Sequence, residues 1–220
     1  QEGNAAASRA APRVCELALD LVDRAELPLN EAEVHAFVAT FQCRRPLRLG
    51  ELWAIPGALR LALIERLRHA AEEAAEQGKL LAEALRPAAP SGSSESGDDE
   101  RPVRCVIESL RALELFDWKE FLDEHSAVER ILREDPARAH HRMDFDSRDH
   151  YRHAVERLAR QSPLAEDRVA LAAVECARES WEDERQRHVG HWLVGPGRPS
   201  LEERIGWRPS MRDRVARLGA

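Results

Sequence analysis

The sequence predicts an all-α protein, a multi-helix bundle of about eight helices with a disordered internal loop. Apolar residues recur at spacings of three and four along most of the chain, which places them on one face of an α-helix. Residues that typically cap helices stand at the start of several of these segments. Aromatic residues make up only 5% of the chain, and long runs of β-branched residues are missing, which argues against a sheet.

The first half of the chain predicts three helices. Residues 14–22 carry an apolar stripe that should end near Leu27-Pro28. Asn30 and Glu33 have the spacing of a capping box, which opens a second helix. The longest helical pattern runs from about residue 49 to 85, and we expect a kink or a break at Pro56-Gly57.

Residues 103–160 are the densest in helix signals. One helix is expected over 103–116 and another from Trp118. Ser126 with Glu129 predicts a capping box for a short helix, which Asp135-Pro136 should stop because the residue before proline leaves helical geometry. Asp146 is expected to cap the helix that follows.

The C-terminal segments carry weaker signals. Ser162-Pro163 predicts the start of a helix over residues 164–186. Residues 188–194 suggest an extended or irregular segment. Ser200 is expected to cap a short helix that Gly206 ends, and Ser210 is a candidate cap for a last one.

Composition divides the chain into parts. Residues 1–11 are small and polar and predict a flexible terminus, and residues 87–102, rich in Pro, Ser, Gly and acids, predict a flexible linker. The linker separates an N-terminal helical part, 12–86, from a C-terminal helical part, 103–220.

Charge and cysteine usage exclude several functions. The net charge is −7 and arginine is interleaved with acids, so no nucleic-acid partner is expected. The four cysteines lie far apart without a CxxC pair, which predicts reduced thiols in a cytoplasmic protein and no zinc site. Residues 52–64 form the longest apolar stretch, which is too short for a membrane span. No nucleotide-binding fingerprint occurs, and no cofactor is expected.

The most chemical-looking segment is residues 140–153, with four histidines among acids and arginines. His150 and His153 could share a metal with Asp146 or Asp149, but no spacing specifies a third ligand, so no metal site is predicted. Asp144 and Asp149 are also candidates for general acid or base, and that alternative stays open. The favoured interpretation is structural, with Arg142 and Arg148 paired to Asp144 and Asp149.

The five tryptophans allow two interpretations. They could be platforms on which sugar rings stack. Trp53 and Trp118 lie in helical patterns and are expected in the core, whereas Trp192 and Trp207 lie in irregular segments and suit a partner surface.

Several blocks of the sequence resemble one family. They are Leu49 to Pro56 (LGELWAIP), Asp117 to Phe121 (DWKEF), Arg142 to Phe145 (RMDF), Arg148-Asp149, Tyr151-Arg152, His188 to Gly190 (HVG) and Gly197 to Glu202 (GRPSLE). In this order they are similar to the N-terminal helical region of bacterial cyclic β-1,2-glucan synthases. The resemblance implies a part of a large membrane enzyme that polymerises glucose from UDP-glucose. It places this chain before the first membrane spans, and no catalytic residue carries over.

The leading hypothesis is therefore a non-catalytic cytoplasmic N-terminal module of such a synthase, at the cytoplasmic face of the inner membrane, with the remaining synthase domains as partners. Its expected docking or ligand surface comprises Arg142, Asp144, Arg148, Asp149, Tyr151, Arg152 and Trp192. One alternative is a module that binds β-glucan. A further alternative is an independent enzyme that uses the His/Asp cluster.

Overall fold

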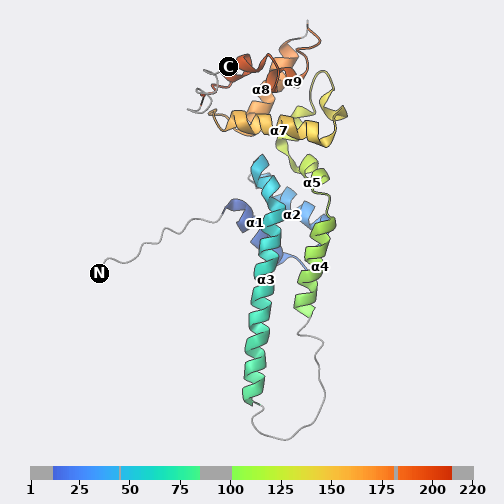
Figure 1. The fold of residues 1–220 in the computed structure, drawn as a ribbon, viewed down its shortest axis with the longest axis vertical. Helices are drawn as coiled ribbons and strands as arrows, with labels where there is room; N and C mark the ends of the chain where they lie inside the picture. The colour runs from blue at the N-terminus through green and yellow to red at the C-terminus, as the bar shows by residue number, and fades with distance from the viewer. Residues whose placement is uncertain (1–11, 45, 85–100, 181–182, 210–220) are drawn as a thin grey trace, which may run out of the picture. The chain divides into compact units, whose positions relative to one another are not determined.

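The protein is predominantly helical in the part that the computed structural model describes, which is residues 12–44, 46–84, 101–180 and 183–209. No strand occurs among these residues, and the predicted all-α fold class is confirmed. The helices are α1 (Arg13–Arg24), α2 (Glu31–Arg44), α3 (Leu49–Ala84), α4 (Arg101–Leu115), α5 (Trp118–His125), α6 (Ala127–Leu132), the 3₁₀ turn η1 (His140–Arg142), α7 (Phe145–Ala159), α8 (Glu166–Glu179), α9 (Val189–Leu193) and α10 (Arg198–Arg204) (Figure 1). The predicted terminus 1–11, most of the predicted linker 87–102 and Ser210 lie outside the described residues.

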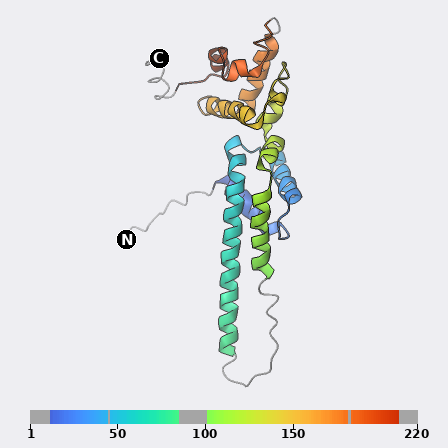
Figure 2. The same ribbon diagram turned by 45° about the vertical axis from the view of Figure 1, so that its right-hand side comes forward.

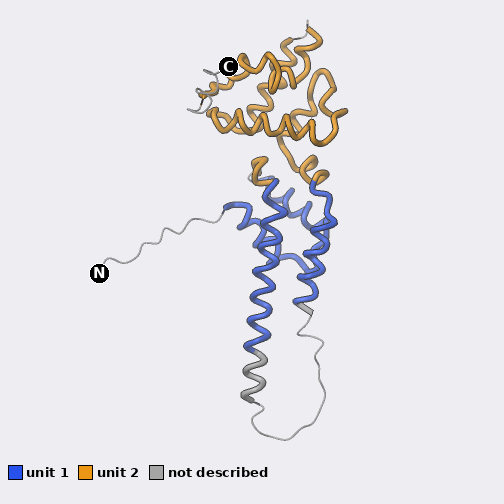
Figure 3. The backbone as a smooth tube through the Cα atoms, in the orientation of Figure 1, with its two compact units in different colours: residues 1–45, 53–118 blue, residues 46–52, 119–220 orange. Residues whose placement is uncertain are grey.

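The chain forms two compact units, which are described separately (Figure 3). Unit 1 comprises residues 1–45 and 53–118, and unit 2 comprises residues 46–52 and 119–220. In the second half of the chain, the boundary between the two units falls between Trp118 and Lys119. This boundary lies inside the segment that the sequence assigned to one C-terminal part. The domain boundaries drawn at 87–102 remain a prediction.

Unit 1 is built on helices that each bury apolar side chains. In both views α3 and α4 run alongside each other (Figures 1 and 2). Burial of aliphatic side chains drives this packing, because each one removed from water contributes about 1.5–3 kcal/mol. The buried aliphatic residues of these helices include Leu17, Leu21 and Val22 of α1, Val34 and Val38 of α2, Ile55, Leu59 and Leu63 of α3, and Val106 and Leu113 of α4.

The entry to α2 is fixed by two sets of hydrogen bonds. The Glu33 amide donates to Asn30 Oδ1 at 2.9 Å, and the Asn30 amide donates to Glu33 Oε2 at 3.4 Å, which confirms the predicted capping box. Ser109 of α4 is fully buried; its hydroxyl accepts from the Leu29 amide at 2.9 Å and donates to the Cys105 carbonyl at 2.7 Å. The start of α2 is thus tied to α4.

Helix α3 continues through Pro56 without a break. Leu52, Ile55, Leu59 and Leu63 are buried. Trp53 is 40% exposed, so the expectation that it lies in the core is wrong. The reason is its register, since a residue two positions before Ile55 is rotated about 200° away from it on a helix.

The core of unit 2 surrounds α8. Its buried residues are mainly small, including Ala170, Ala172, Ala173 and Ala177, which lets neighbouring helices approach closely. Around α8, α6, α7, α9 and α10 contribute Val128, Leu132, Val155, Leu158, Val189, Leu193, Leu201 and Ile205 to the same core. These aliphatic side chains bury the apolar faces of all five helices.

Several predicted helix ends in unit 2 are corrected. Asp144, not Asp146, caps α7, because its Oδ1 accepts from the Ser147 amide at 2.8 Å. Ser162 does not begin α8; its hydroxyl bonds to the Ile205 carbonyl and the Leu164 amide, which delays the helix to Glu166. Residues 189–193 form helix α9 where irregular chain was expected, and α10 begins at Arg198, before Ser200. Gly206 follows α10 with φ +65°, a conformation that glycine adopts without strain.

Candidate functional site

A buried ionic network joins α5, α6, η1 and α7 in unit 2. Arg152 of α7 and Glu129 of α6 have no exposed side-chain surface. Arg152 Nη1 donates to Glu129 Oε2 at 3.0 Å and to Asp123 Oδ1 at 2.6 Å. One helical turn earlier, Arg148 reaches the same two carboxylates, at 3.2 Å from Glu129 Oε1 and 2.6 Å from Asp123 Oδ2. Two guanidinium groups therefore share two carboxylates.

Further side chains complete this Glu129 network, which we define as Asp123, Glu129, Arg133, His140, Arg148, Asp149 and Arg152. His140 is fully buried, and its Nε2 lies 3.1 Å from Glu129 Oε2. Arg133 Nε donates to Glu129 Oε1 at 3.1 Å, and Arg152 Nε donates to Asp149 Oδ1 at 3.3 Å. The Arg152 guanidinium also lies 4.6 Å from the centre of the Phe145 ring, a cation–π contact.

The electrostatics of the network favour the ionised carboxylate. Burial by itself would raise the pKa of Glu129, but the hydrogen bond from His140, the charges of His140 and Arg152, and the hydrogen bond from Arg133 outweigh it and lower that pKa to about 2. Glu129 is therefore a carboxylate at neutral pH and accepts hydrogen bonds only. It holds basic side chains in place and has no proton to donate.

A second arrangement, the Asp135–His188–Tyr151 chain, connects the segment after α6 to α7 and α9. Asp135 Oδ1 accepts from the Val189 amide at 3.0 Å, and its Oδ2 accepts from the Ala139 amide at 3.1 Å. His188 Nδ1 lies 3.0 Å from Asp135 Oδ2, and His188 Nε2 lies 3.1 Å from the Tyr151 hydroxyl. Burial opposes a low pKa for Asp135, but the hydrogen bonds from His188 and the Val189 amide lower it. Burial, and then the charge of Asp135, raise the pKa of Tyr151.

A carboxylate, an imidazole and a hydroxyl in series are the groups that proton transfer requires. The space at the hydroxyl end is filled, however, by the backbone of Gly190. A Cβ added to Gly190 would lie 2.2 Å from Tyr151 Oη and 2.8 Å from His188 Nε2. The close approach explains why glycine stands at this position, and it leaves no room for a substrate between α9 and Tyr151. The chain of hydrogen bonds fastens α9 to α7.

The residues predicted to form a docking surface are distributed between surface and interior. Arg142 and Asp144 are exposed, whereas Asp149, Tyr151 and Trp192 are half-buried. The Arg148 side chain is only 15% exposed, and Arg152 has no exposed side-chain surface. The predicted pairing of Arg148 with Asp144 and Asp149 is wrong, because Arg148 binds Asp123 and Glu129 while Asp144 caps α7.

Several histidine and tryptophan side chains that were considered for metal or sugar binding also have partners within the protein. His153 Nδ1 lies 2.9 Å from the Asp149 carbonyl oxygen and 3.1 Å from its carboxylate, so this histidine is held to the preceding turn of its helix. Trp192 donates from Nε1 to the Gln186 carbonyl at 2.8 Å and packs against the core of unit 2, as does Trp207. Trp118 donates to the Leu113 carbonyl at 3.1 Å and stacks on Phe116, and Trp181 lies outside the described residues.

Sequence reasoning missed four central members of the two arrangements: Asp123, Glu129, Asp135 and His188. Glu129 was interpreted as a capping-box partner and Asp135 as a helix stop. Neither interpretation requires the carboxylate to be buried, so neither pointed to an ion pair in the core. A usable signal was the pair Arg148 and Arg152, which lie one turn apart on one face and need carboxylates if that face is buried.

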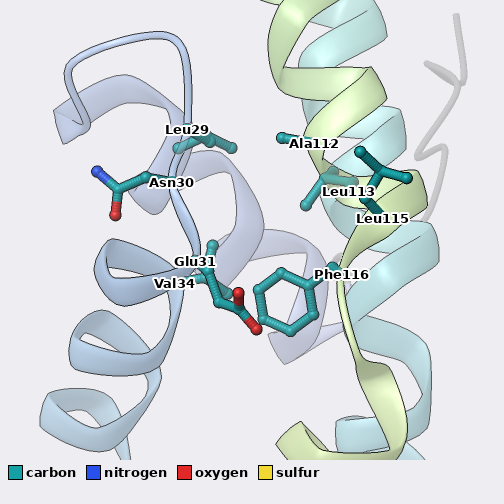
Figure 4. Close-up of a pocket in the computed structure, with 8 residues that line it drawn as sticks. All are labelled: Leu29, Asn30, Glu31, Val34, Ala112, Leu113, Leu115 and Phe116. Atoms are coloured by element: carbon teal, nitrogen blue, oxygen red, sulfur yellow. The ribbon is translucent and has the colours of Figure 1, made fainter.

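A small cavity of about 210 Å³ lies in unit 1 between the start of α2 and the end of α4 (Figure 4). Figure 4 shows the Phe116 ring beside Glu31 and Val34. Leu115, at its edge, is 89% exposed. The lining is therefore mostly apolar and distinct from the charged arrangements of unit 2.

Among the described residues, no helix has the length and apolar character needed to cross a membrane. This includes α3, which spans Leu49–Ala84 but carries charged residues in nearly every turn.

No model of a known protein family matches the chain. The chain is 29% identical, over 94% of its length, to the cyclic beta-(1,2)-glucan synthase NdvB of Rhizobium meliloti (strain 1021). It spans about a tenth of the length of that curated relative, because the matched part is 10% of the synthase. This similarity confirms the resemblance to cyclic β-1,2-glucan synthases that the sequence blocks indicated.

Proposed function

We propose that this chain is a non-catalytic helical module of a cyclic β-1,2-glucan synthase-like membrane glycosyltransferase, and that it positions the membrane and catalytic domains from the cytoplasmic side. The remaining domains of the same protein are its partners. The similarity to a segment of a much longer synthase supports a modular role. The absence of a membrane-spanning helix among the described residues is compatible with it.

The observation that carries the proposal is the inward orientation of the charged residues. Arg148 and Arg152 are bound by Asp123 and Glu129, and Tyr151 is bound by His188. Groups held in this way order helices and cannot reach a substrate without breaking buried ion pairs. Removing one partner of such a pair costs about 3–5 kcal/mol. The two blocks of α7 that resemble the synthases, Arg148-Asp149 and Tyr151-Arg152, therefore maintain the fold.

The surface best suited to contact other domains is the outer face of α3, which we define as Trp53, Leu61 and Ile64. Their exposed fractions are 40%, 64% and 52%. They lie on the side of α3 opposite the buried Ile55 and Leu59, so the helix is apolar on two opposite sides. A helix of this kind is typical of one that packs on both sides. This face replaces the buried arginines in the proposed docking surface; exposed Arg142 and Asp144 remain candidates.

The alternative of a glucan-binding module has narrower support. Among the described tryptophans, Trp118, Trp192 and Trp207 pack against their own units, and Trp53 is the one with substantial exposure. Titration of β-1,2-glucan onto the chain, with tryptophan fluorescence as readout, tests it. A saturable response that Trp53→Ala abolishes would favour glucan binding over docking.

The docking role is tested in the full-length protein that contains this chain. Leu61→Asp with Ile64→Asp places charge on the outer face of α3 without altering the core, and we expect glucan synthesis from UDP-glucose by isolated membranes to fall by about tenfold or more. Ala74→Asp, exposed on another side of the same helix, is the matched control and should leave synthesis unchanged. Unaltered synthesis and assembly in the Leu61/Ile64 variant, with normal protein levels, would refute the docking role.

A further inference from the structure

A groove lined by several arginines in unit 2 follows the turn between α7 and α8. It consists of two adjoining cavities, of about 450 and 580 Å³. They share Arg160, Ser162 and Pro163 as lining residues. Arg48 lines the first cavity and Arg208 lines the second. Each cavity is therefore lined by one arginine of its own, and Arg160 lines both.

These arginines are not equally engaged. Arg160 Nη2 donates to Glu156 Oε1 at 2.6 Å. The backbones of the other two are anchored, since the Arg48 amide donates to Glu51 Oε2 at 2.8 Å and the Arg208 amide donates to the Gln161 carbonyl at 2.8 Å. Within the described part of the chain, neither the Arg48 nor the Arg208 side chain has a carboxylate within 4 Å. Two guanidinium groups thus face solvent with their donors available.

The remaining wall of the groove combines a feature that favours negative charge, the start of α8, with one that opposes it, Glu166. Leu164, Ala165 and Glu166 line the first cavity at the N-terminus of α8, where the N-cap residue Ala165 provides no side-chain acceptor. The positive end of the helix dipole adds to the arginine charges. Glu166 is the acidic side chain of the lining, and its Oε2 accepts from the Leu49 amide at 2.7 Å. Burial, followed by the charges of Glu156 and Glu51, raises the pKa of Glu166, although the Leu49 amide and Arg48 act in the opposite direction.

We propose that this groove is an oxyanion-binding site that takes ligands of the phosphate class, held by Arg48, Arg160 and Arg208. Guanidinium groups bind phosphate oxygens through paired N–H donors, which a single ammonium cannot do. Because three arginines line the two adjoining cavities, a diphosphate offers them more phosphate oxygens to bind than a single phosphate does. Pyrophosphate should therefore bind more tightly than inorganic phosphate. The site is separate from the outer face of α3 and does not depend on the proposed docking role.

The test is calorimetric titration of inorganic phosphate and of pyrophosphate onto the whole chain at low ionic strength and pH 7. We expect one site, with a dissociation constant of roughly 1 mM for pyrophosphate. The double variant Arg48→Gln with Arg208→Gln should bind about tenfold more weakly. Glu166→Gln keeps an acceptor for the Leu49 amide but removes the negative charge, and it should bind more tightly than the parent chain.

Controls separate a specific site from general surface charge. Arg130→Gln removes an exposed arginine of α6 that does not line the groove, and binding should stay within about twofold. The double variant Arg48→Lys with Arg208→Lys retains both positive charges but loses the paired N–H donors of the guanidinium groups. Its affinity should therefore lie between those of the parent chain and the glutamine variant. Circular dichroism checks that each variant is folded. Absence of binding by both anions, or equal weakening by Arg130→Gln, overturns the proposal.

Discussion

Replacing Glu129 by glutamine should destabilise unit 2 more than any other isosteric change in the Glu129 network. Glutamine has nearly the shape of glutamate, so the core is not disturbed and the perturbation is mainly electrostatic. The change removes the shared acceptor of Arg152, Arg148, Arg133 and His140. Arg152, which is fully buried, then retains Asp123 and Asp149 but loses its most buried counter-charge.

The magnitude can be worked from the carboxylate itself. The ordinary pKa of a glutamate is 4.5, and Glu129 in the folded protein has a pKa of about 2. At 1.36 kcal/mol for each pKa unit, the surroundings favour the ionised form by about 3 kcal/mol. The general cost of breaking a buried ion pair, about 3–5 kcal/mol, agrees with this value. We therefore expect Glu129→Gln to lower the free energy of unfolding at pH 7 by about 3 kcal/mol.

The same group gives a pH dependence with a defined sign. The pKa of Glu129 is lower in the folded protein than in the unfolded chain, so its contribution is complete above pH 4.5 and is lost as the pH falls towards about 2. The parent chain should lose stability over this interval. Glu129→Gln should show a flatter profile there, because glutamine does not titrate.

Urea denaturation followed by far-UV circular dichroism, from pH 7 down to pH 3, measures both effects. Hydrogen exchange of the α6 and α7 amides localises the loss to unit 2. Glu134→Gln is the matched control, since Glu134 stands just after α6, is 54% exposed and pairs with Arg178 at the surface. It should cost less than about 0.5 kcal/mol. A Glu129→Gln chain as stable as this control at pH 7, with the parent's pH profile, would refute the reasoning.

Three further changes test other parts of the fold by the same denaturation assay. Gly190→Ala should destabilise the chain by about 1–3 kcal/mol, because the new Cβ would lie 2.2 Å from Tyr151 Oη; adding Tyr151→Phe should recover part of that loss. Ser109→Ala leaves the Leu29 amide without its buried acceptor and should cost about 1–3 kcal/mol, whereas Ser147→Ala at the exposed start of α7 should cost less. Asn30→Ala removes the acceptor for the Glu33 amide and should cost about 1 kcal/mol, while Asn30→Asp should be nearly neutral.

Much of the fold could be predicted because helix signals are local. The capping box at Asn30, the Ser126 cap and the stop at Gly206 lie within a few residues of the groups they bind. The box predicted at Ser126 is only half formed, because the Ser126 amide donates to the Leu122 carbonyl and the Glu129 side chain binds arginines and His140. The errors arise where a distant residue competes. Ser162 looks like a helix cap, but its hydroxyl donates a hydrogen bond to the Ile205 carbonyl, 43 positions away. Residues 189–193 have weak helix propensity, and the hydrogen bond from the Val189 amide to the buried Asp135 fixes the start of α9.

The candidate site was less predictable than the fold for the same reason. Periodicity shows which residues share a helix face, but it does not tell which partner that face meets. Arg148 and Arg152 were recognised as one cluster, yet their carboxylates come from α5 and α6, which precede them by about 20 to 30 positions. Tyr151 was chosen for its place in a family-like block. Its partner His188 lies 37 positions away, in a segment expected to be irregular.

Three of the seven sequence blocks that resemble the synthases contribute to the two buried arrangements. Arg148-Asp149 and Tyr151-Arg152 supply one side of both, and His188 to Gly190 supplies the other side of the second. The resemblance in these three blocks follows from a shared fold, because each substitution there would leave a buried charge or a clash. It says little about shared chemistry at the same positions. The surfaces that distinguish a docking module from a ligand-binding one are instead the outer face of α3 and the arginine groove, which lie in different units and can be altered without disturbing either core.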